Sequence, residues 1–414
     1  MTTPRLAIVD AYSSGALLAP AFAKQGYECV AVHSRREIPE LFRSSFVPDD
    51  FVTVMDAERG AEATAAELAG LDVRHVLAGS EPGVELADEL CEQLGLAANG
   101  IEHRAARRDK YLMGEAVRSR GLRTPAQFHS PELDELLGWA RDRGRWPVVA
   151  KPLRSVASDA VAVCTTDAEL GQAHGAIAGR TNVLGDVNES VLVQEFVEGP
   201  EYVVDTVSYA GHHRVAAFWC YHRPPAGLGV GVFYDAIELL PYEGERQQAL
   251  FAYAAEVLEA LGIRYGPAHT ELIWANGEGP VLVETGARLS AGNNATISRL
   301  CGGPCALDLV VDACLDPEGF LAAPAPRLMG SAMNCFLIPP RGHRLRAQAP
   351  LDEIRGFASF HRLSIAQQNR GHPVIGVVTL VDPSARVVRD DLRRLRELER
   401  TTLYEPAAAA AVGS

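Results

Sequence analysis

The sequence lacks the features that mark several large classes of protein. Among its 414 residues, 39 lysines and arginines are outnumbered by 53 acidic residues, and the net charge at pH 7 is −14. An acidic chain is poorly suited to non-specific binding of nucleic acid or of anionic membranes. Its apolar runs are shorter than a membrane-spanning helix needs. We therefore expect a cytoplasmic protein without a nucleic-acid or membrane partner.

Paired cysteines are also missing. Eight cysteines are present, but no two form the C-x-x-C pair that is typical of zinc and thiol-redox sites. Most of them lie in apolar runs, where a thiol behaves as a small buried hydrophobe. This pattern favours free thiols in a reducing compartment.

Two glycine-rich nucleotide motifs are absent. The loop from Asp10 to Gly15 follows the first apolar run but lacks the G-x-G-x-x-G spacing of dinucleotide-binding enzymes. This absence argues against an oxidoreductase that would use the N-terminal region. The small-residue segment after Lys151 does not have the spacing of a Walker A loop either.

Strand and helix patterns alternate along residues 1–104. This alternation implies a parallel sheet with right-handed crossovers, and we predict a doubly wound α/β domain. Loop tips of such a sheet tend to hold ligands. The segment Gly79-Ser80-Glu81, at the end of the fourth expected strand, is the candidate there, and a helix N-cap before Pro82 is the alternative. The expected strands are 5–10, 28–33, 51–55 and 73–78, and the expected helices are 16–25, 58–69 and 84–94.

Two lysines stand at positions where an anion would be favoured. Asp109 is a good N-cap, which puts Lys110 in the first turn of a helix that ends before Gly121. A cation opposes the helix dipole there, whereas an anion would be favoured by the free N–H groups and by the ammonium. A solvated basic helix end is the alternative. Lys151 ends a short buried strand, and a loop of small residues follows it. Backbone N–H groups of such a flap can approach phosphate oxygens.

A β-hairpin carries the most informative polar residues. Two apolar runs are separated by turn-forming residues 275–280. His269 and Glu271 share one face of the first strand, and Glu284 and Arg288 share one face of the second. If the two faces lie on the same side of the sheet, two carboxylates and a guanidinium converge. The carboxylates suit Mg²⁺, and the arginine suits a carboxylate or phosphoryl group. A solvated polar face is the alternative.

Taken in order, these segments resemble the ATP-grasp superfamily of carboxylate–amine ligases over roughly residues 75–320. The resemblance rests on the helix lysine, the strand lysine with its flap, the run E-F-V-x-G-x-E-Y from Glu195, and E-x-G-x-R from Glu284. The L-amino-acid ligases, which form dipeptides or related amides, are the most similar subgroup. The resemblance implies an α/β ATP-grasp fold. Its expected parts are a Rossmann-like domain over 1–104, an ATP-grasp domain over 105–320 with a lid at about 145–196, and a C-terminal α+β subdomain over 321–414.

The resemblance also implies which residues contact ATP. The expected phosphate contacts are Lys110, Lys151 and the lid residues Ser155 and Ser158. The expected adenine hinge is Gln194, Glu195 and Val197. Glu201 is expected to bond the ribose hydroxyls.

The remaining implied roles concern metal and substrate. Glu271 and Glu284 are the expected ligands of Mg²⁺, with Mn²⁺ as an alternative ion, and Arg288 steadies the substrate carboxylate and the transferred phosphoryl group. His269 is either a proton acceptor or a structural residue beside the metal. Further substrate contacts are expected near a Gly/Pro-rich loop over 222–231 and at Gly292, which has no side chain to fill the pocket. The polar residues expected to contact substrate around that loop are His222, Tyr234 and Asp235.

Two departures from the common family pattern stand out. Many members carry an asparagine two residues after the second glutamate as a third metal ligand, and here that residue is Gly286. The lid has Ala157 and Ala160 where glycines are common. The first departure is similar to the dipeptide-forming subgroup, and the second leaves the conformation of the lid open.

The implied reaction has two steps. A carboxylate takes the γ-phosphate of ATP to give an acylphosphate, and an amine then displaces phosphate to form an amide. Family members are often homodimers. The alternatives are a non-catalytic nucleotide-binding module, a ligase whose amine is not an amino acid, and the oxidoreductase disfavoured above.

Overall fold

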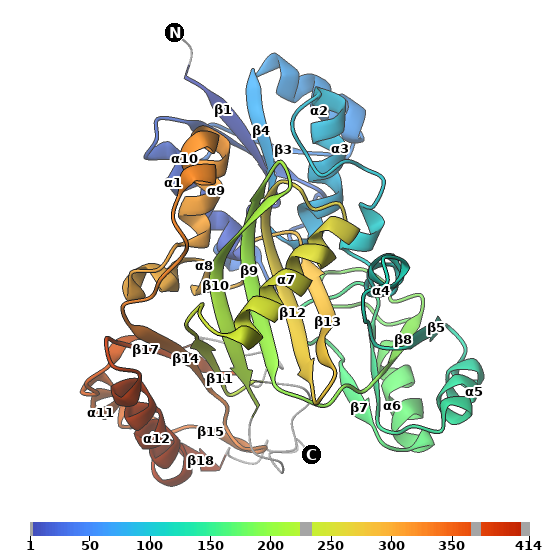
Figure 1. Cartoon of the computed structure of the whole chain (residues 1–414), viewed down its shortest axis with the longest axis vertical. Coiled ribbons are helices and arrows are strands. Elements are labelled where there is room, and N and C mark those ends of the chain that lie inside the picture. Colours follow the sequence, from blue (N-terminus) through green and yellow to red (C-terminus); the bar gives the residue numbers. More distant parts are fainter. Residues whose placement is uncertain (1–2, 224–233, 366–373, 407–414) are drawn as a thin grey trace, which may run out of the picture. The chain divides into compact units, whose positions relative to one another are not determined.

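The computed structural model describes residues 3–223, 234–365 and 374–406, which divide into two compact units (Figure 1). None of the helices in these described ranges has the length and apolarity to span a membrane. The predicted boundaries at 104 and 320 stay a prediction. The first unit comprises Met1–Phe218, Tyr242–Thr296 and Pro304–Pro326, and the second comprises Trp219–Pro241, Ile297–Gly303 and Arg327–Ser414.

The N-terminal part of the first unit is the predicted doubly wound domain. Its parallel strands follow the order β3-β2-β1-β4, so the chain adds two strands on one side of β1 and then one on the other. The carboxyl ends of β1 and β4 therefore form a topological switch point, where such folds bind ligands. The elements are β1 (Arg5–Val9), α1 (Leu18–Ala23), β2 (Glu28–His33), β3 (Thr53–Asp56), α2 (Ala61–Gly70), β4 (Val73–Ala78) and α3 (Val84–Leu94).

A four-stranded antiparallel sheet forms the region that contains the expected lid. Its order is β5-β8-β6-β7, and two helices pack against it over a small core that includes Leu136, Leu170 and Ile177. The elements are β5 (Gln127–Ser130), α5 (Leu133–Arg143), β6 (Val148–Pro152), β7 (Ala162–Cys164), α6 (Asp167–Ile177) and β8 (Val191–Glu195).

The hairpin of the sequence analysis belongs to a third sheet of the first unit. Strands β13, β12, β9 and β10 are neighbours in that order, and α4 and α7 pack against β13. In Figure 1, α7 crosses the face of these strands. The elements are α4 (Lys110–Ser119), β9 (Glu201–Tyr209), β10 (His212–His222), α7 (Glu245–Ala260), β12 (Gly266–Ala275), β13 (Gly279–Gly286), α8 (Asn294–Ile297), α9 (Ala306–Leu315) and α10 (Pro317–Ala322).

The second unit has its own core around Met333, Leu380 and Leu395. Helix α12 packs on β14 and β17, within the strand order β11-β14-β17-β16. The elements are β11 (Ala236–Leu239), β14 (Ser331–Leu337), β15 (His343–Leu345), α11 (Leu351–Arg355), β16 (Phe360–Ile365), β17 (Gly376–Asp382), α12 (Ala385–Thr401) and β18 (Tyr404–Pro406). All eight cysteines are free, and six of them are buried, as expected.

Candidate active site

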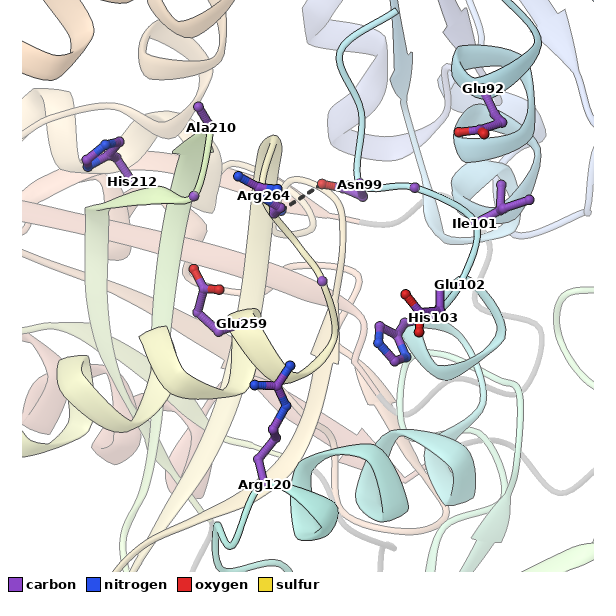
Figure 2. Close-up of a pocket in the computed structure, with 13 residues that line it drawn as sticks. Glu92, Asn99, Ile101, Glu102, His103, Arg120, Ala210, His212, Glu259 and Arg264 are labelled. Carbon is purple, nitrogen blue, oxygen red and sulfur yellow. Dashed lines mark hydrogen bonds between the residues drawn. The ribbon is translucent and has the colours of Figure 1, made fainter. Parts of the chain in front are cut away.

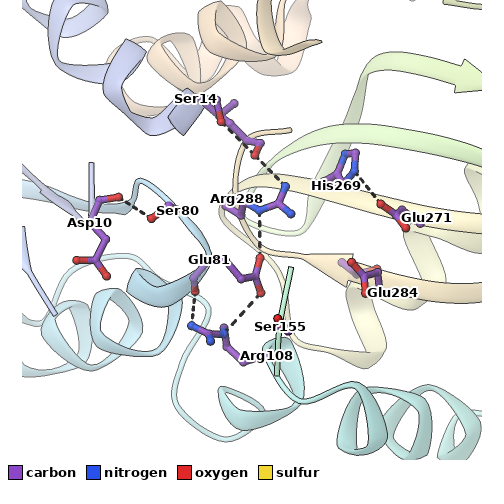
Figure 3. Close-up of polar contacts among 12 residues, drawn as sticks. Asp10, Ser14, Ser80, Glu81, Arg108, Ser155, His269, Glu271, Glu284 and Arg288 are labelled. Atoms are coloured by element: carbon purple, nitrogen blue, oxygen red, sulfur yellow. Dashed lines mark hydrogen bonds and ion pairs between the residues drawn. The ribbon is translucent and has the colours of Figure 1, made fainter. Parts of the chain in front are cut away.

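The register of the hairpin places the two glutamates on one face of the sheet. Glu271 of β12 lies directly opposite Glu284 of β13, and His269 lies opposite Gly286. Figure 3 shows these side chains on the same side of the two strands, with Arg288 beside them. The predicted convergence of two carboxylates and a guanidinium is therefore confirmed. Like charges that face each other across strands are unfavourable unless cations compensate them.

Lys110 is the first of those cations. Asp109 caps α4 by accepting hydrogen bonds from the backbone N–H groups of Tyr111 and Leu112, as expected of an N-cap. The Lys110 ammonium lies 3.1 Å from a Glu284 oxygen and donates to the carbonyl oxygen of Ser155 at 2.8 Å. One lysine thus links the start of α4, the lid and the hairpin.

Glu284 is charged because of its neighbours. Burial raises the pKa of its carboxyl, but Lys110, Lys151 and Arg288 lower that pKa by more, so that it ends below the usual value. A half-buried carboxylate that stays ionised is a suitable ligand for a hard cation.

Lys151, near the end of β6, has fewer polar contacts than Lys110. Its side chain is buried, with a relative exposure of 5% for the residue, and its ammonium makes no hydrogen bond or ion pair with any residue that the structure describes. Burial lowers the pKa of Lys151 to about 8, against the opposing attraction of Glu284, Glu271 and Glu201. A desolvated cation without an acceptor is typical of a site that binds an anion.

His269 is held from both sides. Its Nδ1 lies 2.6 Å from Asp205 of β9, and its Nε2 lies 3.3 Å from Glu271. Burial lowers the pKa of the imidazole, but Asp205 and Glu271 raise it by more, to about 9. A histidine that is protonated at neutral pH cannot accept a proton, so the geometry favours the structural alternative in which His269 orients Glu271. Its role in proton transfer stays a prediction. Asp205 was not predicted, although it lies directly opposite His269 in the sheet register.

Arg288 is held by the N-terminal domain. Its Nε lies 3.1 Å from Glu81, and its Nη1 donates to the carbonyl oxygen of Leu289 at 3.0 Å. Arg108 holds Glu81 in turn, because its Nη1 donates to the Glu81 carbonyl oxygen at 2.5 Å and its Nε lies 3.6 Å from the carboxylate (Figure 3). Glu81 thus connects two arginines at the switch point. Ser80 stands at the N-cap position but makes no side-chain cap there, and donates to the carbonyl oxygen of Asp10 instead.

The residues expected at the adenine hinge lie at the end of β8. Gln194 donates to Gln127 at 2.9 Å, and the Glu195 carboxylate accepts from the backbone N–H of Ala126 at 3.3 Å. Val197 is half-buried just beyond the strand. Glu201, which begins β9, is 3% exposed and close enough to Lys151 to affect its pKa. The expected hinge residues and Glu201, the residue expected to bond the ribose, therefore lie in the same unit as both lysines. Their contacts with a nucleotide stay predictions.

Comparisons with known proteins agree with this arrangement. Residues 144–297 match a family model described as an ATP-grasp domain. The chain is 34% identical over 324 residues to dapdiamide A synthase of Enterobacter agglomerans, which covers 76% of this chain and 74% of that protein. This chain belongs to the ATP-grasp carboxylate–amine ligases. It is an ATP-dependent ligase that forms an amide bond, and such ligases use a divalent metal ion, generally Mg²⁺.

Solved structures show the same fold for the ligase as a whole. The L-amino acid ligase of Bacillus licheniformis superposes with a TM-score of 0.73 at 18% identity and covers 96% of this chain and 98% of that one. The N5-carboxyaminoimidazole ribonucleotide synthetase of Thermotoga maritima has a TM-score of 0.69 at 15% identity, with coverages of 95% and 98%. At these identities, the likeness concerns the fold alone.

The loop 154–160, in the region expected to form the lid, has an unusual backbone. Ala157, Ser158 and Ala160 have φ angles of 58°, 55° and 52°, a left-handed conformation that glycine adopts more easily. Ser155 donates to Asp159 at 2.7 Å and closes the loop on itself. Ala157 and Ala160 therefore adopt the left-handed backbone conformation that glycine favours.

The expected substrate contacts fall in different places. Gly292 is exposed in the first unit, with a φ of 67° and no atom within 4 Å of the position that a Cβ would take. His222, Tyr234 and Asp235 belong to the second unit, and residues 224–231 of the Gly/Pro-rich loop lie outside the described residues. In that unit, His222 pairs with Glu238 at 3.0 Å and Asp235 pairs with Arg396 at 3.5 Å. Their roles toward substrate stay predictions.

A cavity of about 590 Å³ lies elsewhere in the first unit of the ligase (Figure 2). No residue predicted for the site lines it. Its wall carries charges of both signs, including Glu102, Arg120 and Arg264, and the backbone N–H of Arg264 donates to Asn99 at 2.8 Å.

Within the described residues, no group of three or more His, Cys, Asp or Glu side chains is arranged to hold a metal ion. A metal at the hairpin would therefore have two protein carboxylates and would need oxygens from a ligand.

Proposed function

We propose that the ligase activates the carboxylate of an amino acid as an acylphosphate at the face of β12 and β13 and couples it to an amine. The observation that carries this proposal is the register that sets Glu271 opposite Glu284 beneath Lys110 and Arg288. This register supports the proposal because two carboxylates, the kind of ligand that Mg²⁺ prefers, lie beside cations suited to phosphate and carboxylate. The names of dapdiamide A synthase and of the L-amino acid ligase support an amino-acid substrate.

The residues present suit a divalent ion together with ATP. Mg²⁺ is commonly held by one or two carboxylates and by phosphate oxygens, which is the donor set that Glu271 and Glu284 leave to be completed. The ion, or Mn²⁺ in its place, would neutralise charge on the phosphates. Lys110 and Lys151 would bind phosphate oxygens, for which the Lys110 ammonium must leave Glu284 or be shared with it.

The substrate carboxylate attacks the γ-phosphorus of ATP, the bond to the β-phosphate oxygen breaks, and ADP leaves. The amine nitrogen then attacks the acyl carbon, phosphate leaves with the electron pair of the carbon–oxygen bond, and the proton that the nitrogen loses passes to the departing phosphate or to water. Positioning and charge neutralisation account for most of the catalysis of phosphoryl transfer. The lid loop would exclude water, which otherwise hydrolyses the acylphosphate.

The test is ADP release with pooled amino acids and Mg²⁺, followed by mass spectrometry of the products. We expect ADP to form only with amino acids present, together with a product whose mass corresponds to a dipeptide or related amide. Glu284→Gln is the control for catalysis, and we expect its rate to fall at least tenfold, or about 1.4 kcal/mol in barrier. Tight ATP binding without amino-acid-dependent ADP release would contradict the proposal.

A second test concerns substrate size at Gly292. Gly292→Trp should reject large amino acids while it still binds ATP, because a side chain there meets open space that we assign to the pocket. The left-handed backbone at this position strains most residues, so Gly292→Asn is the matched control, since asparagine tolerates that conformation. An unchanged substrate profile in Gly292→Trp would show that this position does not face the substrate.

A further inference from the structure

Gly286 lies two residues after Glu284, and its surroundings give a reason for the absence of a side chain there. It is buried at the end of β13, and its φ is not among the positive values of the chain. Conformational freedom is therefore not what the position requires. A Cβ at Gly286 would lie 2.9 Å from a carboxylate oxygen of Glu81 and 3.2 Å from the Cζ atom of Arg288. The Glu81–Arg288 ion pair occupies the space that a side chain would take.

We propose that the absence of a side chain at Gly286 leaves room for the Glu81 carboxylate beside Arg288. Glu81 can then act as a positioning residue for Arg288. This inference rests on the proposed function, since it explains how the arginine that meets the substrate is held. Residue 286 has no side chain, and the Glu81–Arg288 ion pair lies in the space that one would fill.

The contacts of Arg288 show what the positioning achieves. Glu81 engages Nε and the Leu289 carbonyl oxygen engages Nη1, which fixes the plane of the guanidinium. Its Nη2 makes no hydrogen bond with any described residue, so this guanidinium nitrogen is left for a ligand. A free arginine side chain carries about 2 kcal/mol of rotamer entropy. Holding the group before substrate arrives reduces the entropy lost on binding.

Glu81 is itself well placed to hold the arginine. It follows β4 at the switch point, its side chain is 12% exposed, and the side chain of Arg108 behind it is 4% exposed. Arg108 binds the backbone carbonyl of Glu81 and lies near its carboxylate, so the carboxylate keeps one position. Through the contacts from Arg108 to Glu81 and from Glu81 to Arg288, the N-terminal domain thus fixes the position of the arginine just after β13.

The structure predicts that Gly286→Ala folds but displaces the ion pair. The nearest atom to the new methyl group is the end of a flexible side chain, which can move without disturbing the backbone. The experiment compares Gly286→Ala, Glu81→Gln and the double variant. Gly138→Ala is the matched control, because a Cβ at Gly138 meets nothing within 4 Å.

The first readout does not depend on the reaction. In protein labelled with ¹⁵N-arginine, the Nε–H signal of Arg288 is assigned by its loss in Arg288→Lys. We expect this signal to shift in Gly286→Ala toward its position in Glu81→Gln, and to remain unchanged in Gly138→Ala. An unchanged Arg288 signal in Gly286→Ala would overturn the proposal whether or not a substrate has been found.

The second readout is ADP-release kinetics with the amino acids identified above. We expect Gly286→Ala to lower kcat/KM for the carboxylate substrate about tenfold while KM for ATP changes less than about twofold. Because both single changes release the same arginine, their combined effect should be far smaller than the product of the two. Additive losses, or a matching rise in KM for ATP, would overturn the proposal. Absence of ADP release from the parent enzyme would instead contradict the proposed function.

Discussion

Two buried cations of the first unit, Arg107 and Lys151, differ in how far the protein satisfies them. Arg107 is fully buried, and its guanidinium bonds to Asp88 at 2.6 Å. Its other acceptors are the carbonyl oxygens of Leu261, Gly100, Asn99 and Gly262, at 3.0, 2.8, 2.7 and 3.2 Å. Lys151 is almost as buried, but it has no hydrogen-bond acceptor among the described residues.

The difference separates a structural charge from a functional one. Arg107 joins the linker after α3 to the end of α7, and three of its acceptors, Asn99, Gly100 and Gly262, line the cavity of Figure 2. All of its bonding capacity is used inside the fold, so nothing is left for a ligand. Lys151 is desolvated and has no hydrogen-bond acceptor among the described residues, and we therefore predict that an anion completes its site.

The strongest test of this comparison is the change Arg107→Met. It leaves Asp88 and several carbonyl oxygens without their donor in a buried place. We expect the free energy of unfolding to fall by about 3–5 kcal/mol. Thermal and denaturant unfolding would measure the loss, with Arg120→Met, an exposed arginine at the wall of the same cavity, as the control. Arg107→Met with the stability of the parent would remove the structural side of the comparison.

The pH dependence of stability tests the cost of Lys151. Its pKa is about 8 in the fold and 10.5 as a reference, so the unfolded chain binds more protons between these values. The penalty for the buried charge is therefore complete below pH 8 and is relieved as the pH rises to 10.5. Relative to Lys151→Met, the parent should gain roughly 3 kcal/mol across this window. Melting curves of the two proteins without nucleotide or metal would measure the gain, and parallel curves would contradict it.

The activity of Lys151→Met tests the functional side. We expect the rate of ADP release to fall a hundredfold or more, about 2.7 kcal/mol in barrier, because charge stabilisation at the phosphates is lost. The melting temperature at pH 7 should stay or rise. Lys24→Met is the control, since Lys24 is exposed at the end of α1. A variant that melts early and remains active would place Lys151 with Arg107 as a structural cation.

The smallest effect is expected in the lid beside Lys151, where strain is carried by the backbone. Ala157→Gly removes the penalty of a left-handed alanine and should raise the free energy of unfolding by about 0.5–1 kcal/mol. Ala323→Gly is the control, because its φ of −62° suits any residue and glycine should only destabilise there. Equal effects of the two substitutions on the melting temperature would mean that the lid carries no such strain.

Local patterns predicted the parts of the site that lie on one element or one hairpin. The period of two along a strand put His269 beside Glu271, and the N-cap at Asp109 put Lys110 in the first turn of its helix, both as observed. Helix α5 and strand β5 were missed. Strand β5 has only four residues, and its pairing with β8 is decided by a segment more than sixty positions away.

Pairs from distant segments could not be predicted in the same way. The Glu81–Arg288 pair joins residues 207 positions apart, and the Asp205–His269 pair joins residues 64 apart. The sequence indicated only the segment Gly79-Ser80-Glu81 as a candidate ligand site, without distinguishing Glu81. Nothing in the spacing along the chain indicates that its carboxylate would lie against the arginine rather than cap a helix.

By itself, the sequence determined many of the elements, although not β5 or α5, and the side chains that each presents, because backbone periodicity and capping depend on neighbouring residues. It thereby specified the ATP-grasp family and two carboxylates on strands. The tertiary structure decided the charge state and orientation of these groups, because burial, strand register and the approach of the N-terminal domain depend on segments that meet only in the fold. For that reason Lys151 is a desolvated cation and His269 is protonated. For the same reason, the space beside Gly286 is filled by the Glu81–Arg288 ion pair.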